Sequence, residues 1–295
     1  SQVLPPILGG VEKCTNKFPS RHLGLISAFD SAVADAAFAE IRQRVSQGVD
    51  LQRLRSIANS ALSFSYSGKT ASSCKPASCH PVKIAVAYDE AFHFYYRYNL
   101  QLLEEAGAEL SYFSPINDHH LPIGTSGIIF GGGYPEIYAQ KLQANQVLVQ
   151  QIITCAEGGM PIYGECGGLI YLSQGIELSS SGQFHHFLGL LPLKIKLEEK
   201  LRALGHIEGE LTADCILGKK GVPIKGHQFR YSGVVADDTD HENYKFRLID
   251  HHGSRATEEG FSYKNVIGTY LHMHWGDTPQ IAACFVDHCR RKENG

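Results

Sequence analysis

Residues 161–171 read PIYGECGGLIY and decide the fold, because they join a short apolar strand to a helix through a glycine-rich turn. Gly164, Gly167 and Gly168 flank Cys166 and allow a turn tight enough for the backbone to approach a ligand. A structural cysteine would more often lie inside a continuous apolar stretch, as a small hydrophobe. The segment therefore predicts a strand, a sharp turn with Cys166 at its apex, and a helix.

Apolar runs that predict strands alternate with amphipathic runs that predict helices on both sides of this turn. Strands are expected over 82–88, 108–114, 126–133 and 160–164, and helices over 96–108, over 140–157 and from Gly168 onward. This alternation indicates an α/β fold, a mostly parallel sheet flanked by helices, with its chemistry at the carboxyl ends of the strands. The C-terminal third is expected to extend that sheet or to form a small second one.

Composition limits the classes of function. The 295 residues are 43% hydrophobic and 19% charged, and the formal net charge of -3 comes without any lysine or arginine run. The chain can bury a good core, and neither nucleic acid nor a membrane is expected as a partner. The eight cysteines lie without framework spacing, which favours reduced thiols and a cytoplasmic protein. Nothing resembles a signal peptide or a membrane span.

The chain is expected to divide near residue 75. The stretch 64–81 is rich in serine, lysine, alanine and proline and lacks periodicity, so it is interpreted as a linker. Residues 1–63 precede it, with a helical region over about 31–61, and 82–295 form the main domain. The first part is too short for a self-sufficient domain, so we expect that an N-terminal portion is missing.

The turn around Cys166 has the form of a nucleophile elbow that holds cysteine where hydrolases hold serine. The start of the following helix is expected to lower the thiol pKa, and the N–H of Gly167 can point at an oxyanion. A second oxyanion donor is expected from Gly132 and Gly133, in the turn after another strand. Such glycine turns are common in α/β loops, and most free cysteines only pack, so each feature alone is weak.

A thiol nucleophile needs a base, and the candidate lies in VIGTYLHMHWGD, residues 266–277. The stretch predicts a strand ending in His272 and His274, which alternation places on one face. With fifteen histidines in the chain, any single one is more often a surface or core residue than a catalytic one. A metal site is not expected, because neither this pair nor Cys74, Cys79 and His80 has a convincing further ligand.

Four motifs resemble, in this order, the glutaminase domain of the cobyrinate a,c-diamide synthase family, a class I-like (triad-type) glutamine amidotransferase. They are GGGYPE at 131–136, YGECGGLIYL at 163–172, GHQFRYS at 226–232 and GTYLHMHW at 268–275. Residues 84–115 also resemble the start of that domain, and ILGGV with PSRHLGL is similar to the end of the family's ATP-binding domain. The resemblance covers nearly the whole chain and is specific only in combination.

The resemblance implies a flavodoxin-like glutaminase domain, preceded by a partial helical remnant of a P-loop-type ATP-binding domain. It implies a ligase that amidates the a and c carboxylates of cobyrinate in cobalamin biosynthesis, with ATP, Mg²⁺ and ammonia from glutamine. By position, Cys166 matches the family's nucleophile and His272 the histidine that activates it. The implied partners are glutamine, a corrinoid and the missing N-terminal ATP-binding domain, and a homodimer is left open.

Three departures stand against the pattern. Many class I glutaminases have a glutamate two residues after the histidine, where this chain has His274, so the third triad member is absent or different. The family's more usual GHEFHYS is GHQFRYS here, a motif expected near the corrinoid or the domain interface. The only P-loop-like stretch, SFSYSGKT at 63–70, has Ser63 in place of the first glycine and is interpreted as coincidental.

Three interpretations follow. The chain is the glutaminase part of a cobyrinate a,c-diamide synthase, at most a glutaminase when isolated. A second interpretation is an amidotransferase for another tetrapyrrole, such as hydrogenobyrinate, nickel sirohydrochlorin or an intermediate of the cobyric acid pathway. A third is a non-catalytic glutaminase-like module, against which the presence of Cys166, His272 and both glycine turns argues.

Overall fold

The computed structural model describes residues 5–13, 31–62, 80–179, 181–235, 244–250 and 256–293. The chain divides into two compact units, Ser1–Ser72 and Ser73–Gly295, and each is described by itself. The P-loop-like residues 63–70 lie outside the described part. Among the described helices, none is long and apolar enough to cross a bilayer.

In the first unit, the predicted helical region over 31–61 comprises two helices. They are α1 (Ser31–Gly48) and α2 (Leu51–Asn59). Asp50 breaks the run because its carboxylate accepts a hydrogen bond from the N–H of Arg53 at 2.9 Å and so caps α2. The N–H of Asp50 itself donates to the carbonyl of Leu8 at 2.8 Å. The helical region expected over 31–61 is therefore divided at Asp50.

Five parallel strands form the part of the large sheet that carries the candidate site. Their order is β3 (Ala108–Phe113), β1 (Val82–Ala87), β4 (Gly127–Phe130), β6 (Ile162–Glu165) and β15 (Val266–Thr269). All four residues of β4, β6 and β15 are buried, as expected for strands covered on both faces. The α/β prediction with a parallel sheet is confirmed.

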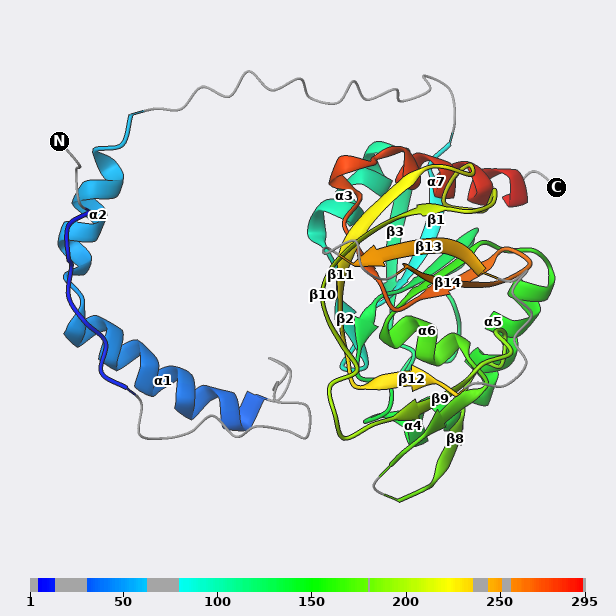
Figure 1. Ribbon diagram of the computed structural model, residues 1–295, viewed down its shortest axis with the longest axis horizontal. Coiled ribbons are helices and arrows are strands. Elements are labelled where there is room, and N and C mark those ends of the chain that lie inside the picture. The colour runs from blue at the N-terminus through cyan, green and yellow to red at the C-terminus, as the bar shows by residue number, and fades with distance from the viewer. Residues whose placement is uncertain are drawn as a thin grey trace. The chain divides into compact units, whose positions relative to one another are not determined.

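Helices cover both faces of these strands (Figure 1). On one face lie α3 (Arg97–Glu105) and α7 (Gln280–Glu293), and on the other α4 (Ala139–Ala144), α5 (Gln146–Glu157) and α6 (Gly167–Leu172). Successive residues of β1 join the two cores in turn, because side chains alternate along a strand: Ile84 packs with the α3 and α7 side, Ala85 with the other. The turn of Cys166, between β6 and α6, is thus held between two packed layers.

The predicted helix over 140–157 is also two helices, broken at Asn145. The side-chain amide of Asn145 donates to the carbonyls of Pro115 and Asp118, at 2.9 and 2.7 Å. The backbone of Asn145, with φ of -80° and ψ of 59°, leaves the helical region, so α4 ends and α5 begins there. The tie holds the loop after β3 against the helical layer.

Beyond β15 the sheet continues with antiparallel strands. In order from β15 these are β14 (Ala256–Tyr263), β13 (Tyr244–Asp250), β10 (Ala203–Leu211), β11 (Pro223–Arg230) and β16 (His272–Met273). Only two residues separate β15 from β16 along the chain, yet four strands lie between them in the sheet. The antiparallel part must therefore curl back on itself, which brings β11 against the end of β15.

Two smaller sheets complete the unit. One has the order β12 (Ser232–Val234), β9 (Lys194–Leu197), β7 (Gly175–Glu177) and β8 (Phe184–His186). The other pairs β2 (Phe92–Phe94) with β5 (Gly132–Gly133). A short 3₁₀ helix, η2 (Trp275–Asp277), follows β16. The C-terminal third therefore both extends the main sheet and contributes to a second one, the two outcomes left open by the sequence.

Candidate active site

Cys166 occupies the strained turn between β6 and α6. Its φ of 48° and ψ of -98° place a non-glycine residue in a conformation that costs free energy and persists only where the surroundings enforce it. Two hydrogen bonds enforce it here: the N–H of Cys166 donates to Thr269 at the end of β15 (2.7 Å), and the N–H of Gly168 donates to Gly131 (3.0 Å). The turn geometry predicted from the sequence is present.

The thiol itself differs from the prediction. Burial, reinforced by the carboxyl group of Glu136, raises the pKa of Cys166 to about 12, although the Gly167 N–H donates to the sulfur and lowers it. The expected lowering by the helix start is wrong in net effect, because α6 is only six residues long and desolvation of the thiolate outweighs its dipole. In the free protein Cys166 is a neutral thiol.

The predicted oxyanion glycines lie around this thiol. Gly132 and Gly133 form β5, and a methyl group on Gly167 would lie 2.9 Å from the N atom of Gly133. A methyl group on Gly132 would lie 2.5 Å from Cε1 of His272. The glycine strand thus separates the start of α6 from the candidate base, and neither approach leaves room for a larger residue. The role of these amides remains a prediction.

His272 lies on β16, buried, directly opposite His227 of β11. The two imidazole rings stack with centroids 4.8 Å apart and planes at 12°. Burial, together with the neighbouring His227, lowers the pKa of His272 to about 4, so its imidazole is neutral at physiological pH. Among the described residues, no carboxylate is hydrogen-bonded to either ring nitrogen of His272. A neutral imidazole can accept the thiol proton.

The second predicted histidine lies in a different environment. The expected continuous strand is wrong: β15 ends at Thr269, β16 comprises only His272 and Met273, and His274 follows it, exposed. The ring of His274 stacks on Tyr98 at 6.0 Å, and its Nδ1 accepts from the N–H of Gly276 at 3.3 Å. His272 is buried and His274 is exposed, a difference that the alternation in the sequence did not predict.

Glu165 connects the turn of Cys166 to the strand of His272. Its carboxylate accepts hydrogen bonds from the phenol of Tyr163 (2.7 Å) and from the N–H of Met273 (3.2 Å). Met273 also offers its carbonyl to the side-chain amide of Asn99, at 2.7 Å. The residue before Cys166 therefore holds the residue after His272. Burial raises the pKa of Glu165 to about 8.

Three residues near Cys166 and His272 were not predicted as site residues: Glu165, His227 and Tyr96. His227 lies in GHQFRYS, which the sequence assigned to the corrinoid or domain interface, whereas the structure pairs that motif with the strand of His272. Its Nδ1 lies 2.9 Å from the hydroxyl oxygen of Tyr96. Glu165 precedes Cys166 directly and could have been noticed as a charged residue in an apolar strand. His227 could not, because its position depends on the curl of the sheet.

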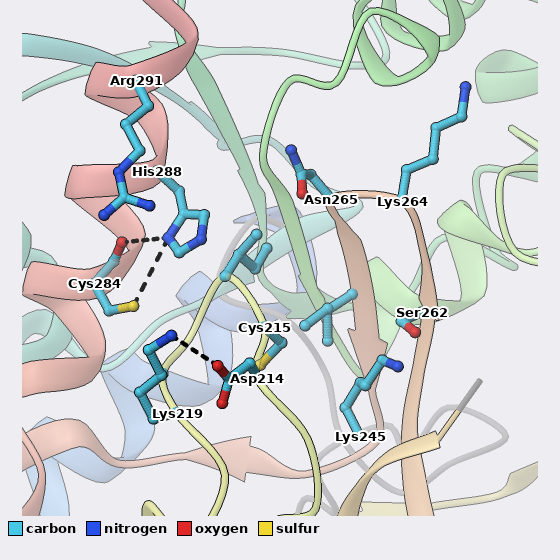
Figure 2. Close-up of a pocket in the computed structure, with 13 residues that line it drawn as sticks. Asp214, Cys215, Lys219, Lys245, Ser262, Lys264, Asn265, Cys284, His288 and Arg291 are labelled. Carbon is cyan, nitrogen blue, oxygen red and sulfur yellow. Dashed lines mark hydrogen bonds and ion pairs between the residues drawn. The ribbon is translucent and has the colours of Figure 1, made fainter. Parts of the chain in front are cut away.

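A separate cavity of about 290 Å³ lies toward the opposite end of β15 (Figure 2). Asn265 and Ile267 line it, whereas Cys166 contacts Thr269 at the far end of the strand. Its basic side chains are partly neutralised, since Lys219 pairs with Asp214 at 2.7 Å. None of the predicted site residues lines it. Within the described residues, no group of three histidine, cysteine or acidic side chains could hold a metal ion.

The raised thiol pKa predicts slow alkylation of Cys166. At pH 8 we expect iodoacetamide to modify it at least about a hundredfold more slowly in the folded protein than in urea, because only the thiolate reacts. The rate should keep rising about tenfold per pH unit up to pH 10, as expected far below the pKa. Peptide mass spectrometry after timed quenching measures both. A rate that levels off near pH 8 would contradict the neutral resting thiol.

Known proteins match this chain in sequence and in fold. Residues 83–280 match the CobB/CobQ-like glutamine amidotransferase domain. A cobyrinate a,c-diamide synthase of Leptospira interrogans is 39% identical over 288 residues, covering 97% of this chain and 62% of the relative. The corresponding synthase of Syntrophotalea carbinolica is 36% identical, with coverages of 97% and 62%. The chain thus spans less than two thirds of the length of these relatives.

A solved structure supports the fold. A crystal structure of a glutamine amidotransferase superposes with a TM-score of 0.50 at 16% identity, covering 70% of this chain and 98% of that one. At this identity the likeness concerns the fold alone. The resemblance predicted from the four motifs is confirmed by the match over 83–280 and by the relatives. The chain belongs to the CobB/CobQ-like glutamine amidotransferase family.

Proposed function

We propose that this chain hydrolyses glutamine at Cys166 and supplies the ammonia for ATP-dependent amidation of corrinoid carboxylates, those of cobyrinate first. The observation that carries the proposal is the placement of Cys166 in a strained turn, beside a glycine strand that also contacts His272. Support for the corrinoid comes from the names of the two relatives. The reaction is that of a cytoplasmic carbon–nitrogen ligase.

The first half of the reaction transfers a proton and forms a thioester. The neutral Cys166 thiol passes its proton to the neutral imidazole of His272 as the sulfur attacks the carboxamide carbon of glutamine. The negative charge that develops on the carboxamide oxygen is stabilised by the backbone N–H of Gly167 and by amides of Gly132 and Gly133. The imidazolium of His272 then protonates the departing nitrogen, and ammonia leaves.

The second half restores the thiol. Water attacks the γ-glutamyl thioester while His272 accepts one of its protons, the carbon–sulfur bond breaks, and the proton returns to the Cys166 sulfur. Glutamate leaves. The low pKa of His272, caused by burial, makes an imidazolium formed there give its proton up readily, whereas it disfavours the first transfer from the neutral thiol, which must be coupled to formation of the sulfur–carbon bond. Each turnover consumes glutamine and water and yields glutamate and ammonia.

Amidation of a carboxylate needs chemistry that the described residues do not offer. A carboxylate is a poor acyl donor until phosphorylation supplies a leaving group, and phosphoryl transfer needs a phosphate cradle with magnesium. The described residues contain no glycine-rich loop followed by GK[ST], so no step through ATP is assigned to them. We propose that ATP and Mg²⁺ bind in the portion of the relatives' length that this chain does not cover.

Glutamine labelled with ¹⁵N in its side-chain amide tests both parts of the proposal. We expect the purified chain to release labelled ammonia, and to leave cobyrinate unamidated even with ATP and magnesium. Fused to the uncovered N-terminal part of the Leptospira interrogans relative, it should form the labelled diamide. Faster amidation of hydrogenobyrinate or nickel sirohydrochlorin would reassign the ring. Absence of glutamine hydrolysis in both forms would favour a non-catalytic module.

A further inference from the structure

Two charged side chains beside Cys166 carry buried polar atoms without a partner. In the described part of the chain, Oε2 of Glu136 and Nε of Arg230 are both buried and make no hydrogen bond. Leaving a buried charged group unsatisfied is costly, so such groups are rare unless a ligand or solvent completes them. The reaction steps derived above use neither residue.

Glu136 lies three residues after the glycine strand β5. It follows Pro135, whose Cδ would lie 3.0 Å from a methyl group on Gly167, so the segment after β5 contacts the start of α6. The carboxyl group of Glu136 is buried and, next to burial itself, is the largest influence raising the pKa of the Cys166 thiol. Its carboxylate therefore lies close to the nucleophile.

Arg230 is the last residue of β11. Its guanidinium lies over the ring of Tyr270, 4.2 Å from the centroid, and Nη1 donates to the carbonyl of Ser232 at 2.6 Å. The hydroxyl of Ser232 donates to the Tyr270 hydroxyl at 3.2 Å. Tyr270 follows Thr269, the residue that binds the N–H of Cys166. The guanidinium of Arg230 and the turn of Cys166 are thus both held by residues at the end of β15, Tyr270 and Thr269.

We propose that Arg230 binds the α-carboxylate of glutamine and Glu136 its α-ammonium group, so that the two residues form the subsite for the amino-acid head of the substrate. This inference rests on the proposed glutaminase function. Glutamine carries an anion and a cation on one carbon, two methylenes from the carboxamide that reacts. A fixed guanidinium and a carboxylate beside the nucleophile match that pattern, and the ligand would satisfy both unpartnered atoms.

The head-group subsite explains why Oε2 of Glu136 and Nε of Arg230 are buried without a hydrogen-bond partner. No ion pair joins Glu136 to Arg230 within the described structure, so each stays available to a charged ligand. Because Arg230 already stacks on Tyr270 and holds Ser232, its planar group is oriented before the ligand arrives. Binding the head at two points would place the carboxamide in one orientation at Cys166.

Two truncated substrates separate the two contacts. Glutaramate lacks the α-ammonium group and 4-aminobutanamide lacks the α-carboxylate. We expect Arg230→Met to raise the KM for glutamine about 10- to 100-fold with kcat little changed, the loss expected of one charge-assisted contact, and to leave hydrolysis of 4-aminobutanamide as in the wild type. Glu136→Gln should do the same for glutamine while leaving glutaramate hydrolysis unchanged.

Matched controls are Arg247→Met and Glu210→Gln, an exposed pair 3.9 Å apart on the antiparallel strands, which should alter no kinetic constant. Arg230→Lys should recover part of the lost affinity. Calorimetry of glutamine binding in a Cys166→Ala background gives a readout independent of turnover, and thermal melting of each variant separates misfolding from lost contact.

The outcomes separate this inference from the proposed function. If the wild type hydrolyses glutamine but Arg230→Met and Glu136→Gln keep its KM, the subsite is wrong and the glutaminase proposal stands. Equal losses on glutamine and on both truncated substrates would also overturn the subsite, because a general structural effect does not depend on the head group. If the wild type neither hydrolyses nor binds glutamine, both proposals are wrong.

Discussion

Replacement of Cys166 by alanine is expected to abolish glutamine hydrolysis, lowering kcat by at least about 10⁴-fold, because no other group can form the acyl intermediate. Cys166→Ser should be nearly as inactive, since a buried hydroxyl is harder to ionise than the thiol it replaces. Release of ¹⁵N ammonia from labelled glutamine measures the loss. In the fused enzyme, amidation with free ammonia should survive both substitutions.

Cys284→Ala is the matched control for this loss. Cys284 is also partly buried and also near a histidine, with its Sγ 3.7 Å from Nδ1 of His288, yet it lines the other cavity. It should retain full glutaminase activity. The glutamine-mimicking electrophile diazo-oxo-norleucine should label Cys166 and spare Cys284. Labelling spread evenly over the cysteines, or equal loss of the glutamine- and ammonia-dependent reactions in Cys166→Ala, would contradict the role as nucleophile.

Local periodicity predicted most of the parallel part of the fold. Apolar runs placed β1, β3 and β6 within two residues of their observed bounds, and placed the start of β4 within one residue. The strands β1, β4 and β6 are almost wholly buried and apolar, whereas β3 lies at the edge of the sheet. The predicted helix over 140–157 failed at Asn145, whose side chain bonds to backbone carbonyls far away in the chain, a contact that depends on tertiary placement. The predicted helical region over 31–61 is helical but divides at Asp50, which caps the second helix through a local bond to Arg53.

Only part of the candidate site could be predicted from the sequence. Cys166 is marked by its glycines, and the backbone strain at its φ of 48° follows from the same turn. The surroundings of His272 have no such local signal. They arise because the antiparallel strands curl back and bring β11 against β16, a contact between residues more than forty apart in the chain. The local sequence preferences for helix or strand do not predict that β11 and β16 pair.

The prediction for the thiol failed for a different reason. A helix start lowers a thiol pKa, but the pKa of Cys166 also depends on burial and on Glu136, which lies thirty residues earlier in the chain. Burial disfavours the thiolate more than the first turn of this short helix stabilises it. Cys166 is therefore expected to lose its proton only as its sulfur attacks the substrate, and not in the resting protein. A base that accepts this proton is then needed for the reaction to proceed.

His272→Ala is accordingly expected to lower kcat for glutamine hydrolysis by about 10²- to 10⁴-fold, the usual cost of a lost general base. With the thiol protonated at neutral pH, little thiolate forms without a proton acceptor at hydrogen-bonding distance. The residual rate of His272→Ala should rise with pH between 7 and 10, because hydroxide then supplies the thiolate that the imidazole no longer generates. The rate of the wild type should change far less over the same range.

The neighbouring histidines test whether position or mere proximity matters. His274→Ala should keep kcat within about threefold of the wild type, since the exposed ring contacts Tyr98 and its own turn rather than the glycine strand. His227→Phe keeps a flat ring against His272 and removes the contact with Tyr96, so it should lower kcat less than His272→Ala does. If His274→Ala proves the more damaging, the base is His274. If both retain activity and His272→Ala does too, Cys166 is activated by a group that lies outside this pair of strands.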